Sequence, residues 1–128
     1  MIPILQAIHA ANRWAIIVIA VAGIVHALLH LRGDGATRGA GKILGSVFLA
    51  LLDIQLLAGA ALLVLVAGVR HYAVPHSLLM LAAILVAHLL RLSAKKADAH
   101  RAGRLALSLY VGPLALITLG LTAVPIPR

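Results

Sequence analysis

The sequence has 128 residues, of which 63% are hydrophobic and only 11% are charged, with eleven basic and three acidic residues. So few charged side chains cannot cover the apolar surface of a soluble protein, so the composition excludes a soluble domain and indicates an integral membrane protein. The net charge of +8 is therefore not interpreted as a nucleic-acid-binding surface, and no nucleic-acid partner is expected.

Four apolar runs are long enough, or nearly so, to cross a hydrocarbon core, which requires about 20 helical residues. Leu and Ala dominate them without a two-residue alternation, and an open sheet does not exist in lipid. The sequence therefore predicts an all-α fold, a transmembrane four-helix up-down-up-down bundle with residues 1–128 as one domain. The expected helices are 14–31, 43–69, 76–92 and 105–124, with residues 1–13 as an interfacial opening and Pro75 at the start of the third helix.

The basic residues are unevenly divided between the two sides of this bundle. Three belong to the side of the termini, and eight belong to the first and third loops: Arg32, Arg38, Lys42, Arg91, Lys95, Lys96, Arg101 and Arg104. The positive-inside rule then places these loops in the cytoplasm. We expect a multi-pass protein of the bacterial inner membrane with both termini on the outer side.

Asp53 is an acid in the middle of the second apolar run. It follows Lys42 by eleven residues, about 16 Å along a helix, and an ionisable group at that depth is a functional hypothesis by default. Gln55 is turned by ~200° from Asp53 and must face another neighbour. Asp53 is interpreted either as a hydrogen bond that locks two helices or as a proton relay or quinone contact, with Gln55 as a further candidate for quinone or for helix packing.

The seven histidines suggest a haem. His26 and His88 lie about 9 Å and 4.5 Å inside the interfacial Arg32 and Arg91, on two different helices. A b-type haem needs two neutral imidazoles that face each other from different helices. His26 and His88 are therefore the leading candidates for ligands of the haem iron, and His30, one turn from His26, is an alternative ligand.

His9 and His76 form a second candidate pair of haem ligands, toward the outer face. His76 and His88 are twelve residues apart and so point about 120° away from each other, which favours one haem over two. A hydrogen bond between helices, or a place at the interface, remains the alternative for each histidine. Zinc and copper are disfavoured, because the chain has no cysteine and no compact histidine cluster beyond His26 and His30.

Four motifs carry a resemblance to a known family: "HAANRW" at 9–14, "LLDIQLLAG" at 51–59, "PHSLLMLAAILVAH" at 75–88 and the closing "VPIPR". With them the chain resembles a family of small four-helix bacterial integral membrane proteins that has no assigned activity. The resemblance covers most of the chain. It implies that the positions of interest are His9, Asp53, Gln55, His76 and His88. His26 lies outside these motifs, which makes the pair of His9 and His76 a stronger candidate for the haem ligands.

The leading functional hypothesis is a membrane-integral, b-type cytochrome-like electron-transfer subunit or anchor. It would relay electrons between a partner protein and quinone, with one or two haems b and with Asp53 in proton uptake. General architecture is also similar to the haem-bearing membrane anchors of respiratory dehydrogenases, as a fold-level analogy. The short loops leave no substrate domain, so the expected partners are a larger redox or membrane complex or further copies of the chain. Two alternatives stay open: a cofactor-free accessory subunit and a small proton-coupled transporter.

Overall fold

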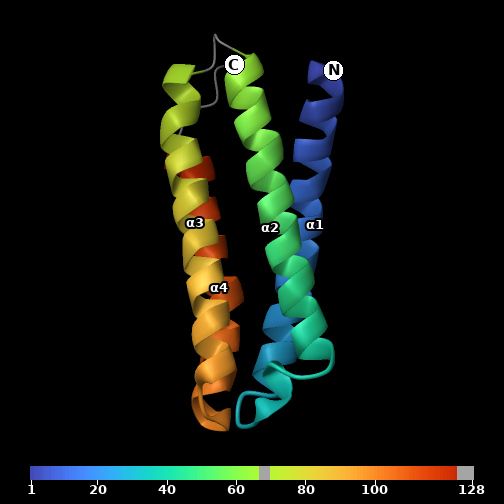
Figure 1. The fold of residues 1–128 in the computed structure, drawn as a ribbon, viewed down its shortest axis with the longest axis vertical. Helices are drawn as coiled ribbons and strands as arrows, with labels where there is room; N and C mark the ends of the chain where they lie inside the picture. Colours follow the sequence, from blue (N-terminus) through green and yellow to red (C-terminus); the bar gives the residue numbers. More distant parts are fainter. Residues whose placement is uncertain (67–69, 124–128) are drawn as a thin grey trace.

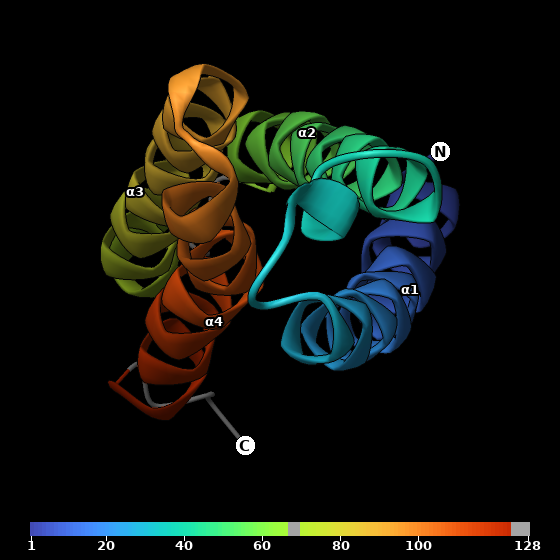
Figure 2. The ribbon, with the colours of Figure 1, turned by 90° about the horizontal axis from the view of Figure 1, so that it is seen from below.

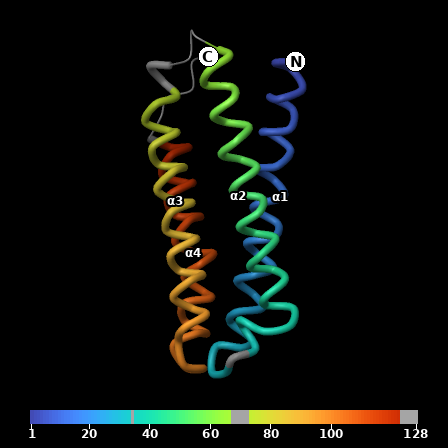
Figure 3. The backbone as a smooth tube through the Cα atoms, in the orientation of Figure 1, coloured from blue at the N-terminus to red at the C-terminus, as the bar shows by residue number. Residues whose placement is uncertain are grey.

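The computed structural model describes residues 1–66 and 70–123, and the regular elements in this part of the chain are all helical. They are α1 (Ile2–Leu29), the short 3-10 helix η1 (Asp34–Ala36), α2 (Ala40–Leu65), α3 (Arg70–Lys96) and α4 (Ala99–Ala123). The helices alternate in direction (Figure 1). Figure 3 shows the start of α1 and the end of α2 at one end, and Figure 1 shows the start of α3 at the same end, here called the N-terminal end. The opposite end, with η1 and the α3–α4 turn, is the basic end.

Seen along its axis, the bundle is a ring in which α1 packs on α2, α2 on α3, α3 on α4, and α4 on α1 (Figure 2). All four helices are long and apolar enough to span a membrane. Large apolar side chains are exposed on all four, which suits lipid and not water. The predicted all-α four-helix membrane bundle is confirmed.

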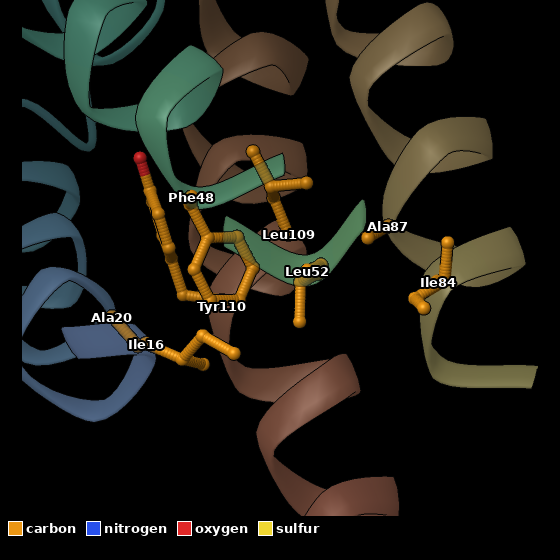
Figure 4. Packing of buried hydrophobic residues seen from close by; sticks show 8 residues of the cluster. All are labelled: Ile16, Ala20, Phe48, Leu52, Ile84, Ala87, Leu109 and Tyr110. Atoms are coloured by element: carbon orange, nitrogen blue, oxygen red, sulfur yellow. The ribbon is translucent and has the colours of Figure 1, made fainter. Parts of the chain in front are cut away.

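The core lies between the four helices near mid-height and takes two residues from each (Figure 4): Ile16, Ala20, Phe48, Leu52, Ile84, Ala87, Leu109 and Tyr110. The Phe48 and Tyr110 rings are tilted by 57° with centroids 5.1 Å apart, a favourable aromatic arrangement. Gly23 of α1 is needed beside the Tyr110 ring, because a Cβ at residue 23 would clash with that ring. The core therefore fixes how the helices are rotated against one another.

The first helix is longer than the sequence predicted. α1 begins at Ile2 and not at residue 14, because Pro3 occupies its first turn and residues 2–13 are part of the helix instead of forming an interfacial opening. It ends at Leu29, two residues before the expected end. This places His9 about 10 Å along the helix from its start.

The other helix ends also differ from the prediction. α2 runs from Ala40 to Leu65, and the expected helical residues 67–69 and 124 lie outside the described part of the chain. α3 begins at Arg70, so Pro75 lies inside it and does not start it. α4 begins six residues early because Asp98 caps it: the Asp98 carboxylate accepts a hydrogen bond of 2.8 Å from the Arg101 N–H.

Candidate functional site

A cavity of about 270 Å³ lies between α1, α2 and α3 in the N-terminal half of the bundle. Its wall is mostly apolar, with side chains such as Leu56, Leu63 and Met80. Five polar residues also line it: Gln6, His9, Gln55, His76 and Ser77. An apolar cavity with a few convergent polar groups is the usual form of a small-molecule site.

A chain of hydrogen bonds connects α1 to α2 at the cavity wall. Asn12, which is only 9% exposed, donates from Nδ2 to the Leu51 carbonyl and to Gln55 Oε1, both at 2.8 Å. Because Gln55 Oε1 accepts, its Nε2 faces His9, where it donates to the His9 carbonyl at 3.1 Å and lies 3.2 Å from the ring atom Nε2. The orientation of both amides follows from this chain.

These hydrogen bonds also determine which nitrogen of His9 carries the proton. Since Gln55 donates to Nε2, that nitrogen is the acceptor and the proton of the neutral ring lies on Nδ1. His9 Nδ1 is buried and has no hydrogen-bond partner among the described residues. A buried donor without an acceptor costs about 1–3 kcal/mol, so an acceptor atom supplied by a ligand would be stabilised there.

Gly59 of α2 makes room for the His9 ring. A Cβ at residue 59 would lie 3.3 Å from His9 Cε1 and 3.7 Å from Nδ1, so a larger side chain would crowd the unpaired donor. His76 of α3 lines the same cavity, and Gly120 of α4 lies next to the His76 ring. The structure thus brings His9 and His76 to one cavity from helices on opposite corners of the bundle.

His26 and His88 each contact a different neighbour in the structure. The His26 ring stacks on the His30 ring, with centroids 4.3 Å apart and planes at 24°, and His30 Nδ1 donates to the His26 carbonyl at 2.9 Å. His88 Nε2 instead lies 3.0 Å from Asp53 Oδ1. Within the described residues, no hydrogen bond or ring contact joins His26 to His88, and none of these four side chains lines the cavity.

Asp53 and His88 form a pair between α2 and α3 that is open to the surroundings of the bundle. The side chain of Asp53 is 48% exposed and that of His88 45%. The two groups can share a proton, as an ion pair or as a neutral hydrogen bond. Gln55 points the other way, to α1, in agreement with the turn expected between it and Asp53.

Sequence reasoning missed Asn12, although it is the residue that orients Gln55. The available signal was the spacing of His9 and Asn12, three residues apart in "HAANRW" and therefore on one helix face. It was also unexpected that Arg91 is buried, only 7% exposed, against α2. In the described part of the chain, no group of three or more His, Asp or Glu side chains is placed to hold a metal ion.

Comparison with known proteins adds no assignment to this geometry. The chain matches no protein-family model, no curated protein and no solved structure.

Proposed function

We propose that this protein is a redox subunit of the bacterial cytoplasmic membrane and that the cavity between α1, α2 and α3 binds the head group of a quinone. One observation carries the proposal: His9 lines a cavity among apolar helices, and its Nδ1–H is a buried donor that finds no acceptor among the described residues. A quinone carries carbonyl oxygens, which are acceptors, on a single ring, and its apolar tail suits the lipid-exposed helix faces.

The polar residues of the cavity have distinct roles in this proposal. His9 Nδ1 donates to one quinone carbonyl, held in place by Gln55 and, behind it, Asn12. His76, on the facing helix, is available to the second carbonyl. Reduction to the quinol takes up two electrons and two protons; a partner redox protein supplies the electrons. His76 is the cavity imidazole that can pass protons to the ring oxygens, whereas His9, whose Nε2 is held by Gln55, only donates a hydrogen bond.

The orientation of the chain follows from its charge. Eight basic residues belong to the basic end and the turns beside it. We therefore assign this end to the cytoplasmic side and both termini to the outer side. The quinone cavity is then in the outer half of the membrane. The pair of Asp53 and His88 does not line the cavity, so in this proposal it serves helix packing or a proton path outside the quinone site.

A b-type haem is the second candidate, because α1 and α3 each supply one histidine to the same cavity. His9 and His76 would hold the iron, and the haem would supply one-electron transfer. The fit is weaker than for quinone in two respects. Gln55 occupies the lone pair of His9 Nε2, and about 270 Å³ suits a single substituted ring better than a macrocycle. The pair of His26 and His88 has less support, because both rings have other partners.

The quinone proposal is tested by titrating decylubiquinone into the purified protein in a neutral detergent and measuring the heat of binding. His9→Phe keeps a ring but removes the donor, and His26→Phe makes the same change outside the cavity. Loss of one hydrogen bond, about 0.5–1.5 kcal/mol, predicts binding about 2- to 12-fold weaker for His9→Phe and unchanged for His26→Phe. Circular dichroism verifies that both variants are folded.

Equal affinity of the His9→Phe variant and the wild type would refute the proposed donor. A reduced-minus-oxidised visible spectrum of protein produced with ample haem distinguishes the second candidate. A b-type band that is lost in both His9→Phe and His76→Phe would assign the cavity to haem. If neither quinone binding nor a haem band were found, the protein would be an accessory subunit, or a transporter if Asp53→Asn abolished proton flux in vesicles.

A further inference from the structure

A second cavity, of about 530 Å³, lies at the basic end of the bundle and is lined by four cationic residues. Arg38 precedes α2, Lys42 lies in its first turn, and Arg91 and Lys95 belong to the last two turns of α3. No acidic residue is among those that line it in the described part of the chain. The like charges of Lys42, Arg91 and Lys95 repel one another, so the cavity favours an anion.

Asp53 and Asp98 both have hydrogen-bond partners of their own. Asp53 pairs with His88 farther along α2, and Asp98 caps α4 through the Arg101 N–H. The cavity also adjoins the start of α4, since Ala99 and Ala102 line it. The start of α4 does not add to this attraction, because the Asp98 carboxylate already caps it.

Arg91 distinguishes this cavity from a simple basic surface, because its charged side chain is buried and hydrogen-bonded in place. Its side chain is 93% buried, and Nη2 donates to the Lys42 carbonyl at 3.0 Å and to Ser46 Oγ at 3.1 Å. Gly45 permits this close approach, because a Cβ there would clash with the guanidinium. Arg91 has no carboxylate partner among the described residues, and a buried cation is stabilised by a counter-ion.

We propose that this basic cavity binds the phosphate group of an anionic phospholipid. The cavity lies where the spanning helices end, at the depth of the lipid head groups. Ile43 and Leu92, the residues that follow Lys42 and Arg91, are exposed and offer an apolar surface for acyl chains. Basic pockets between membrane helices on the cytoplasmic side are a known form of lipid head-group site. This inference is independent of the quinone proposal.

The test is native mass spectrometry of the whole protein in a neutral detergent with increasing dioleoyl phosphatidylglycerol. Lys42→Gln/Lys95→Gln removes two exposed cations from the cavity, while Arg101→Gln/Arg104→Gln removes two exposed cations outside it. The Lys42 carbonyl that binds Arg91 belongs to the backbone and is kept. A loss of about fivefold in affinity per cation predicts binding about 25-fold weaker for the lysine variant and unchanged for the arginine variant.

Two results would overturn the proposal. Equal weakening in the two double variants would mean that the lipid responds to diffuse positive charge and not to the cavity. Complete displacement of the lipid by millimolar inorganic phosphate would assign the site to a soluble anion. Retained binding in the arginine variant, together with resistance to inorganic phosphate, supports the lipid.

Discussion

Replacement of Asn12 by leucine removes the polar connection between α1 and α2 while keeping a side chain of similar size. Asn12 donates two hydrogen bonds of 2.8 Å across this interface, one to the Leu51 carbonyl and one to Gln55. Hydrogen bonds between membrane helices average about 0.6 kcal/mol each and reach about 1.7 kcal/mol. We therefore expect the free energy of unfolding to fall by about 1–2 kcal/mol.

The same substitution should weaken quinone binding. Without Asn12, Gln55 Oε1 loses the donor that fixes the amide, and the contact from Gln55 Nε2 to His9 is no longer enforced. Affinity for decylubiquinone should then fall although neither removed atom touches the ligand. A double-mutant cycle with Gln55→Leu should show strong coupling, because the two residues act through one chain of hydrogen bonds.

Stability is measured by titrating the protein in mixed micelles with dodecyl sulfate and following the helical signal by circular dichroism. Ser108→Ala is the control, because the Ser108 hydroxyl donates within its own helix, to the Arg104 carbonyl. If Asn12→Leu unfolds at the same detergent fraction as Ser108→Ala and binds quinone like the wild type, the role given to this polar chain is wrong.

Two further substitutions test other parts of the bundle. Gly23→Ala places a methyl group against the buried tyrosine ring of α4 and should lower the free energy of unfolding by about 1–3 kcal/mol, whereas Gly33→Ala, with open space around it, should not; the same micelle titration compares them. Asp53→Asn weakens a half-exposed pair with His88, so we expect a loss of at most about 1 kcal/mol and no change in quinone affinity, measured by calorimetry. A large loss of quinone affinity in Asp53→Asn would contradict the location of the site.

The sequence predicted the helices but not where they end. Apolar length alone set the expected bounds, so the polar first turns of α4 were taken for a loop, although Asp98 caps a helix there. In the same way Pro3 was not recognised as a helix start. Helix caps and first turns are local polar features that average hydropathy does not detect.

The candidate residues were found more readily than their partners. His9, Gln55 and His76 were all singled out from the sequence and line one cavity in the structure, whereas Asn12 was not. The spacing within a helix gives the angle between two of its side chains, and it correctly turned Gln55 away from Asp53. It does not say which side chain of another helix lies opposite.

By itself, the amino-acid sequence determined that this chain is a four-helix membrane bundle, because hydrocarbon accepts only segments that satisfy their own backbone hydrogen bonds. Only the tertiary structure decided that Asp53 pairs with His88 and that His9 shares a cavity with His76. The reason is that interlocking core side chains such as Phe48 and Tyr110 set the rotation of each helix against its neighbours. That rotation depends on the shape of side chains from all four helices at once, and no single segment of the sequence contains it.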